Sequence, residues 1–340
     1  MMKKWLRRIA KTLAALVVVA LLAGTTWELL ARQFARRDYP PPGRLVGIGG
    51  RRIHIDCRGG GKPVVVLIAG LGLDGSTSWS AVRDSLAHIT RTCAVDRAGI
   101  LWSDPAPGPA TAKSAADDIH AALASAGEAT PLVLVGHSLG GPYAMVYTKY
   151  YGADVAGLVL VDASHPDQIE RITAISPAFA LKVSPVERLL PALAWSGLPR
   201  VLLGRDDPMP NQSREAVRTM NAWAPTSLAA ELKEAEALAG ILTEARAFRW
   251  LGDRPLVVLT GMRPMPAEDR SRLGITVEQG EALRQAWKKL QDDEATWSSR
   301  SQHRLVDDAS HYIQYWRPDV VIEAVRSVVD SVRSSPGGRE

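Results

Sequence analysis

The sequence predicts an α/β fold in which a mostly parallel central sheet is flanked by helices and carries one helical lid insertion. Apolar runs that suit strands buried on both faces, such as residues 64–69, alternate with segments of helical periodicity. This alternation is typical of a parallel sheet with helices on both faces. It stops between residues 165 and 252, where prolines divide a stretch of helical pattern. That stretch is the predicted lid, and residues 44–164 and 253–333 are the predicted core.

The first part of the chain differs in charge from the rest. The formal net charge of the whole protein is +5, but residues 1–52 contain 11 Lys and Arg against only Glu28 and Asp38. The remaining residues are therefore slightly acidic, and this distribution does not favour nucleic acid binding.

Residues 1–38 predict an N-terminal membrane anchor. Basic residues between positions 3 and 11 precede an uncharged apolar run at residues 12–27. This run is slightly short for a membrane span, which needs about 20 residues, but Lys11 can snorkel and Trp27 suits the interface. The basic residues keep the N-terminus cytoplasmic, so the domain is expected on the exported side, periplasmic or extracellular. A signal peptide cleaved after Ala23 is the alternative, and residues 39–43 are the predicted linker.

The strands of the predicted sheet are short apolar or alternating runs bounded by Gly and Pro. They are residues 45–48, 52–58, 64–69, 91–95, 132–135, 156–161, 255–260 and 302–306. The helices predicted outside the lid are residues 79–88, 111–126, one beginning near Tyr143, 276–299 and 318–332. Within the lid, prolines from Pro177 to Pro225 predict several short helices, and residues 334–340 are predicted to be disordered.

The central strand ends in Gly136-His137-Ser138-Leu139-Gly140, and a helix follows. A Ser on a sharp turn between strand and helix needs neighbours without side chains, because strand and helix approach each other closely there. The helix N-terminus directs N–H groups to the space beside the Ser oxygen, where negative charge develops in acyl transfer. Ser138 is therefore the candidate nucleophile.

Together these features resemble the α/β-hydrolase family over residues 44–333. The resemblance rests on Gly136-His137-Ser138-Leu139-Gly140-Gly141, on Asp96-Arg97-Ala98-Gly99 followed by Trp102-Ser103-Asp104, and on Ala309-Ser310-His311 before the last helix. Leu101 departs from the family pattern, which usually has Gly at this position. The resemblance implies a serine hydrolase, similar to esterases and lipases, with a lid after the sixth strand.

The resemblance also implies that His311 is the base that takes the proton of Ser138, because the family's His follows the last strand. His137 lies inside the turn and is expected to pack behind Ser138. His165, near the end of the sixth strand, is a weaker alternative.

The carboxylate that accepts the His311 N–H stays open between two residues. The family usually places it after strand seven, where this chain has Met262. Asp162, at the end of the sixth strand, is the first candidate, and Glu268 is the second. The alternative role of Asp162 is to cap the following turn.

Two backbone N–H groups are expected to form an oxyanion hole. One belongs to Leu139, directly after the candidate nucleophile, and the other to Leu71 in the Gly-rich loop after the third strand. A phosphate-binding loop is the alternative, but no Lys followed by Ser or Thr supports it.

Cys57 and Cys93 are expected to form a disulfide. In the family's sheet order their strands are neighbours, and the exported compartment is oxidising. Two buried free thiols are the alternative, because a register shift of one residue would turn one side chain away.

We therefore expect a serine hydrolase that cleaves small-molecule carboxylic esters through an acyl-enzyme. Apolar lid residues such as Leu189 and Trp195 suggest apolar acyl groups. An amidase or aminopeptidase is one alternative, but Glu231, Glu234 and Glu236, which could bind an amino terminus, are expected to face solvent. A non-catalytic binding protein of the same fold is the other alternative. No cofactor and no metal site are predicted.

Overall fold

A computed structural model describes residues 2–128, 130–180, 182–204 and 207–335 of the chain, so residues 336–340 of the predicted disordered tail lie outside it. Its centre is an eight-stranded sheet with the strand order β1-β2-β4-β3-β5-β6-β7-β8. β2 pairs antiparallel with β1 and β4, and all other neighbours are parallel. The strands are β1 (Arg44–Gly47), β2 (Arg52–Arg58), β3 (Val64–Ile68), β4 (Thr92–Val95), β5 (Leu132–His137), β6 (Val155–Val161), β7 (Leu256–Gly261) and β8 (Ser301–Val306). The predicted α/β fold with a mostly parallel sheet is confirmed.

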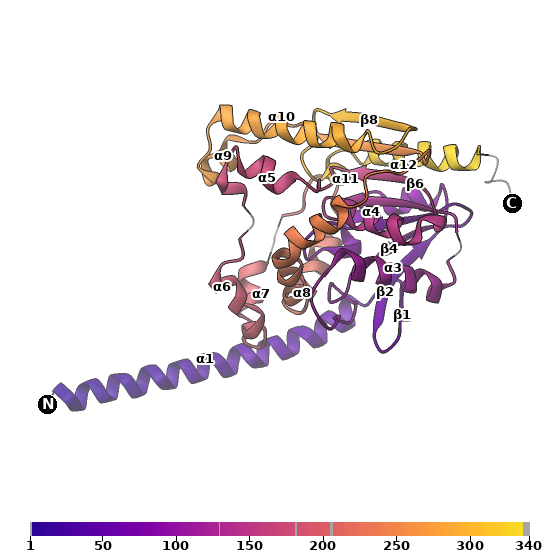
Figure 1. Cartoon of the computed structure of the whole chain (residues 1–340). Helices are drawn as coiled ribbons and strands as arrows, with labels where there is room; N and C mark the ends of the chain where they lie inside the picture. The colour runs from indigo at the N-terminus through magenta and orange to yellow at the C-terminus, as the bar shows by residue number, and fades with distance from the viewer. Residues whose placement is uncertain (1, 129, 181, 205–206, 336–340) are drawn as a thin grey trace.

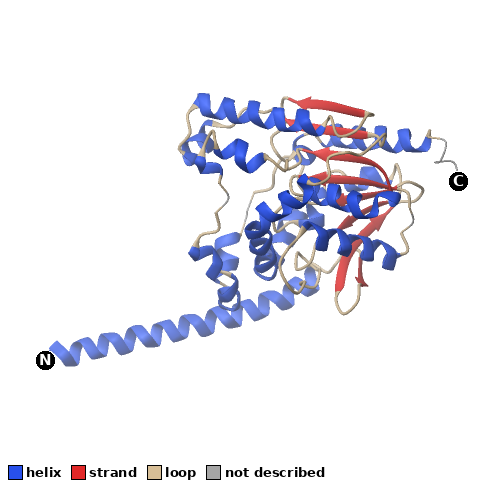
Figure 2. Ribbon diagram, viewed as in Figure 1, coloured by secondary structure: helices blue, strands red, loops and turns tan. Residues whose placement is uncertain are grey.

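Helices cover both faces of the sheet (Figure 2). On one face pack α3 (Ala112–Ala126), α4 (Gly140–Tyr151) and the end of α8 (Arg214–Arg246). On the other face pack α2 (Arg83–Ala87), α11 (Ile313–Trp316) and α12 (Pro318–Arg333). Valines three and four residues apart along α12 form its buried stripe, because residues at this spacing share one helix face. The helix predicted at residues 79–88 is instead the 3-10 turn η1 (Gly75–Trp79) followed by α2.

The predicted disulfide joins the antiparallel and parallel parts of the sheet. Cys57 of β2 stands directly opposite Cys93 of β4, and their sulfur atoms are bonded to each other. β4 also pairs with β3 in the parallel part. The prediction of this bond is confirmed, and the bridge ties the N-terminal hairpin to the rest of the sheet.

The insertion between β6 and β7 has two parts. The first, which we call the outer lid, spans residues 168–203 and contains α5 (Gln168–Thr173), η3 (Pro177–Phe179), α6 (Pro185–Leu189), η4 (Pro191–Ser196) and α7 (Leu198–Leu203). The second is the long helix α8. Two further helices, α9 (Ala267–Leu273) and α10 (Val277–Glu294), follow β7.

Pro225 lies inside α8, so the prediction that it breaks the helix is wrong. Proline has no N–H, and the carbonyl four residues earlier therefore loses its usual helical partner. Here that carbonyl belongs to Asn221, and the guanidinium of Arg200 donates to it at 3.2 Å and to the carbonyl of Ala222 at 3.0 Å. A side chain of the outer lid thus replaces the hydrogen bond that the proline removes.

The N-terminal segment forms a single helix, α1 (Met2–Asp38), which extends away from the domain (Figure 1). Among the described residues it is the one helix long and apolar enough to cross a bilayer. Its C-terminal end is fastened to the domain, because the indole N–H groups of Trp102 and Trp223 donate to the carbonyl of Tyr39 at 3.0 and 3.1 Å. The end of α1 is therefore not a free tether.

Candidate active site

Ser138 lies on the turn between β5 and α4 with a backbone φ of 50°. This left-handed conformation is strained for a residue with a side chain and directs Ser138 away from the strand. Glycines make the turn possible. A Cβ on Gly136 would lie 2.5 Å from the carbonyl oxygen of Gly140, and a Cβ on Gly140 would collide with the carbonyl of Ile68 in β3.

The structure brings His311 and Asp162 together. The Nδ1 atom of His311 lies 2.7 Å from Oδ2 of Asp162, although 149 residues separate them in the chain. The carboxylate of Asp162 is buried, whereas the imidazole is 41% exposed. Both residues line one pocket with Ser138, so all three candidate catalytic residues face the same space.

The other oxygen of Asp162 is also hydrogen bonded. It accepts the backbone N–H of Gly261 at 2.8 Å and the indole N–H of Trp287 at 3.0 Å. These two donors hold the carboxylate in one orientation toward His311. The end of β7 therefore supplies a donor to Asp162 rather than a carboxylate of its own.

Glu268, the second candidate, lies elsewhere. Its side chain is 83% exposed on α9 and pairs with Arg272 one turn along the same helix. Met262, at the position where the family usually has a carboxylate, is buried.

His137 contacts the loop that carries His311. Its Nε2 atom lies 3.0 Å from the backbone carbonyl of His311, and its ring is 4.8 Å from the His311 ring, centroid to centroid. Burial, and next the nearby His311, hold the pKa of His137 well below its usual value. A neutral His137 with its proton on Nε2 donates to this carbonyl. The expected packing role thus includes a hydrogen bond that sequence reasoning did not identify.

His165 is engaged away from this pocket. Its Nε2 atom lies 2.9 Å from the carboxylate of Asp293, and its Nδ1 atom accepts the backbone N–H of Asp167 at 3.0 Å. Both ring nitrogens therefore have partners outside the pocket of Ser138.

The two residues expected to form the oxyanion hole, Leu71 and Leu139, line the same pocket as Ser138. Leu139 directly precedes α4. The loop that carries Leu71 approaches closely, because a Cβ on Gly70 would lie 2.9 Å from the Cβ of Ser138. Only glycine at position 70 permits this approach.

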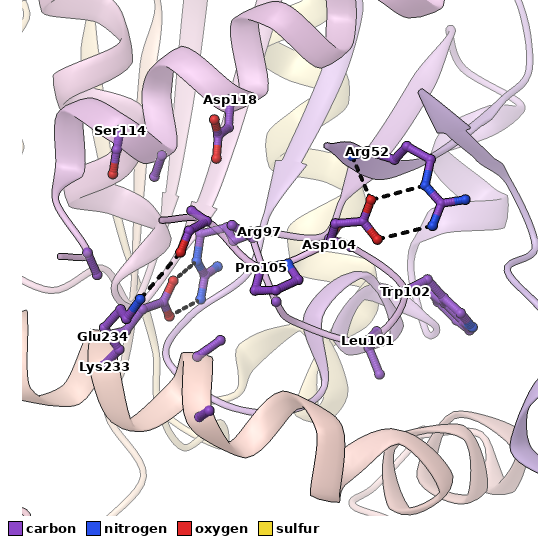
Figure 3. A pocket seen from close by; sticks show the side chains of 18 of the residues that line it. Arg52, Arg97, Leu101, Trp102, Asp104, Pro105, Ser114, Asp118, Lys233 and Glu234 are labelled. Carbon is purple, nitrogen blue, oxygen red and sulfur yellow. Dashed lines mark hydrogen bonds and ion pairs between the residues drawn. The ribbon is translucent and has the colours of Figure 1, made fainter. Parts of the chain in front are cut away.

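Arg97 holds that loop in place, and Figure 3 shows the buried ion pair that Arg97 forms with Glu234. The guanidinium of Arg97 bonds both oxygens of Glu234 at 2.7 Å and donates to the carbonyls of Ala69 and Gly70 at 2.7 and 2.8 Å. Burial alone would lower the pKa of Arg97, but Glu234 raises it above its usual value. The expectation that Glu234 faces solvent is wrong. A buried charge needs a partner, and Arg97 at a strand end was the signal that could have indicated one.

Leu101, where the family pattern usually has Gly, has the backbone conformation that glycine favours. Its φ is 48°, a conformation that glycine adopts without strain. Its backbone N–H donates to the Ser227 hydroxyl of α8 at 2.9 Å, and its side chain is buried. The strained backbone of Leu101 is thus held by a hydrogen bond with α8 and by a buried side chain.

The pocket of Ser138 has a volume of about 600 Å³. Its walls combine apolar side chains of the outer lid, α8 and α10 with a few charged ones. Besides Ser138, His311 and Asp162, they include Leu71, Leu139, Ile169, Ile172, Phe179, Lys182, Leu238, Arg263, Met265, Leu283, Arg284 and Trp287. A second cavity of about 810 Å³ adjoins Arg97 and Glu234 and is also lined by Trp102, Trp223 and Asp118 (Figure 3).

Comparisons with known proteins agree with this architecture. The family model for the alpha/beta hydrolase family matches residues 65–324. A probable transporter from Hormonema carpetanum is 26% identical over 314 residues, which cover 84% of this chain and 42% of that protein. The chain spans less than half of the length of the first curated relatives that it matches.

Two solved structures illustrate the likeness in fold. A thermophilic esterase from Thermogutta terrifontis is 23% identical, with a TM-score of 0.54 over 84% of this chain and 97% of that chain. A meta-cleavage product hydrolase from Pseudomonas fluorescens is 17% identical, with a TM-score of 0.56 over 85% and 98%. At these identities the likeness concerns the fold alone.

Proposed function

This chain belongs to the alpha/beta hydrolase family, and on that premise we propose that it is a serine hydrolase that cleaves carboxylic esters through an acyl-enzyme. The observation that carries the proposal is the hydrogen bond of 2.7 Å between His311 and Asp162 in the pocket that Ser138 also lines. A hydroxyl is a weak nucleophile at neutral pH and needs such a base.

In the proposed mechanism, the Nε2 atom of His311 takes the proton of Ser138 while the Ser138 oxygen attacks the ester carbonyl. Nδ1 of His311 carries the proton shared with Asp162, which leaves Nε2 unprotonated and ready to accept. The buried carboxylate then stabilises the imidazolium. His311 returns the proton to the leaving alcohol, and water releases the acyl group from Ser138 by the same steps.

The backbone N–H groups of Leu71 and Leu139 are the proposed oxyanion hole. Negative charge that develops on the carbonyl oxygen would lie beside the N-terminus of α4, where Leu139 is located. Arg97 supports this role indirectly, because it holds the carbonyls of the residues just before Leu71. Arg97 is thus a positioning residue in the proposal.

The pocket walls favour esters with apolar acyl groups over substrates with a free amino terminus. Ile172, Phe179 and Leu283 offer apolar surface for an acyl chain. Of the three carboxylates that an aminopeptidase could use, Glu234 pairs with Arg97 and Glu236 pairs with Arg188. Glu231 is not among the residues that line the pocket of Ser138. Ester cleavage is therefore the reading that these contacts support.

We also propose that α1 anchors the protein in a membrane with the catalytic domain on the exported side. The apolar run at residues 12–27 and the basic residues before it support this orientation. The disulfide between Cys57 and Cys93 supports it independently, because such bonds persist in oxidising compartments.

Labelling with a fluorophosphonate, together with hydrolysis of a panel of esters and amides of graded acyl length, tests the proposal. The wild-type protein should react with the label and cleave esters with longer acyl chains fastest. Ser138→Ala and His311→Ala should each lose activity by several orders of magnitude, because nucleophile and base act as a unit. Ester hydrolysis at the wild-type rate by Ser138→Ala would refute the proposed nucleophile.

A further inference from the structure

The helix α1 crosses the outer lid at very short distance. A Cβ on Gly197, between η4 and α7, would lie 2.8 Å from the ring of Trp27. A Cβ on Gly24 of α1 would collide with the carbonyl of Ser196. Two glycines, one on each element, therefore allow the backbones to pack against each other at this point.

An ion pair fastens this crossing. The side chain of Glu28 is 1% exposed and bonds two nitrogen atoms of Arg200 in α7, at 2.9 and 3.1 Å. Arg32 bonds the same carboxylate at 2.8 Å and the carbonyl of Ala194 in η4 at 3.3 Å. Paired, bidentate contacts of a buried carboxylate are directional and strong. We call this set of contacts the Glu28 clasp. It joins the outer lid to one position along α1.

The Glu28 clasp lies where the apolar run of α1 ends. That run, residues 12–27, stops directly before Glu28. The N-terminal half of α1 extends away from the domain (Figure 1). At 1.5 Å per residue the run is about 24 Å long, less than the bilayer core of about 30 Å. A short span is accommodated by local thinning and by drawing its flanking residues toward the membrane. Because the Glu28 clasp joins the outer lid to these flanking residues, the outer lid is drawn toward the membrane as well.

The outer lid exposes many large apolar side chains. On α6, η4 and α7 these are Val186, Leu189, Trp195, Leu198, Val201 and Leu202. An exposed apolar patch of this kind is typical of a contact with a membrane or a partner, and Trp is enriched at membrane interfaces. Figure 1 shows α5, α6, α7 and α9 on the side of the domain toward which the N-terminal half of α1 points.

The same segment forms part of the wall of the candidate active site. Ile169 and Ile172 of α5 and Phe179 of η3 line the pocket of Ser138, and α6 is the next helix in the chain. The apolar wall of the pocket and the apolar exterior of the outer lid therefore belong to successive elements of the same segment.

We propose that α6, η4 and α7 dock on the lipid bilayer beside α1, held there by the Glu28 clasp, and that the pocket of Ser138 receives an amphiphilic ester from that bilayer. The occupant of the apolar patch is thus lipid. The inference rests on the anchor and the ester hydrolysis proposed above. The experiments below distinguish a failure of the docking from a failure of the anchor or of the ester hydrolysis.

A fluorescent probe on the outer lid tests the docking. The two native cysteines are bonded to each other, so Val201→Cys in the full chain introduces a single free thiol for an environment-sensitive fluorophore. Leu305→Cys on β8 is the matched control, because Leu305 is also an exposed apolar residue but lies on the edge strand of the sheet. Both proteins are reconstituted in phosphatidylcholine vesicles with nitroxide-labelled lipid.

The probe at position 201 should be quenched by the nitroxide lipid several-fold more than the probe at position 305. Equal quenching at the two positions would overturn the docking. A probe at 201 that is shielded from water but not quenched by lipid would assign the patch to a second copy of the chain and would also overturn it. Flotation of the full chain with the vesicles tests the anchor separately, because a protein that does not float refutes the anchor itself.

The role of the clasp is tested by Arg200→Gln, with Arg188→Gln as the control in the same outer lid. Arg188 pairs with the exposed Glu236 of α8, and within the described residues it makes no ion pair with α1. Arg200→Gln should lower the quenching at position 201 by half or more, whereas Arg188→Gln should leave it unchanged. Equal quenching in both variants would overturn the role of the clasp.

The route of the substrate is tested with two esters, one water-soluble with an acetyl group and one with a long acyl chain held in the vesicles. Val201→Asp should keep the rate on the soluble ester within about twofold and lower the rate on the vesicle-bound ester about tenfold. Leu305→Asp should change neither rate. An unchanged ratio of the two rates in Val201→Asp would overturn the proposed entry from the bilayer, whereas a wild-type protein inactive on both esters would refute the ester hydrolysis alone.

Discussion

The two parts of the insertion between β6 and β7 are packed very differently. α8 buries twelve residues, among them Glu234 with its ion pair to Arg97. The described residues of the outer lid include only three buried ones, Ser176, Gly197 and Pro199. α8 is thus structurally part of the core, whereas the outer lid is a cover joined to the rest through few polar contacts. Both α8 and the outer lid lie in the insertion between β6 and β7, so the place of a segment in the sequence does not tell how well it is packed.

Pairs of carboxylates, one buried and one exposed, test the same contrast between packed and exposed residues elsewhere in the molecule. The largest effect is expected at the carboxyl end of β6. Asp162→Asn should lower kcat about ten thousandfold, because the amide no longer favours the imidazolium of His311. Glu268→Gln, on the exposed helix α9, should leave kcat within twofold. Hydrolysis of a soluble ester by the two variants measures the difference, and the reverse ranking would move the carboxylate to the loop after β7.

The second effect is on stability and concerns two residues of α8. Glu234→Gln leaves the buried charge of Arg97 without its partner and should lower the free energy of unfolding by about 3–5 kcal/mol. Glu236→Gln, two positions further along, removes only an exposed ion pair with Arg188 and should cost less than about 1 kcal/mol. Denaturation of both variants in the same detergent tests this. If both variants lost the same amount of unfolding free energy, the buried ion pair of Glu234 would contribute no more to stability than the exposed pair of Glu236.

Limited proteolysis should separate the two parts of the lid. Trypsin should cut the detergent-solubilised protein after Lys182 and Arg188 in the outer lid about tenfold faster or more than after Lys233 in α8, because regions with few buried contacts open locally at lower free energy. Mass spectrometry of early fragments gives the order of the cuts. First cleavage within α8 would contradict the proposed difference.

The smallest effect is the pH dependence of stability that Glu231 of α8 contributes. Burial, and next the charges of Glu234, Asp74 and Glu187, raise the pKa of Glu231 to about 7 from its usual 4.5. Below pH 4.5 the carboxyl is protonated in both the folded and the unfolded chain and contributes nothing. Between pH 4.5 and 7 only the unfolded chain releases the proton, so the folded state loses stability as the pH rises.

Glu231→Gln removes this loss. The variant should be more stable than the wild type at pH 8, on the order of 1 kcal/mol, and equally stable at pH 4. Thermal denaturation of the wild type and of Glu231→Gln across this pH range measures the difference. A stability gain that is the same at both pH values would exclude titration of Glu231 as its cause.

Many features of this protein follow from short stretches of the sequence. The strands, the glycines around Ser138 and the apolar run of α1 each depend on one continuous stretch of fewer than twenty residues, and local periodicity and turn chemistry suffice to predict them. The Cys57–Cys93 bond could be predicted only after the resemblance supplied the order of the strands.

The contacts between distant segments were decided by the tertiary structure. The sequence left Asp162 and Glu268 as alternatives for the partner of His311, and only the meeting of β6 with the loop after β8 distinguishes them. It also predicted that Glu234 faces solvent and that Pro225 breaks a helix. Both were wrong for one physical reason. Arg97 and Arg200, more than 20 residues away in each case, provide the charge and the donor that these positions require, and no local pattern encodes such a partner.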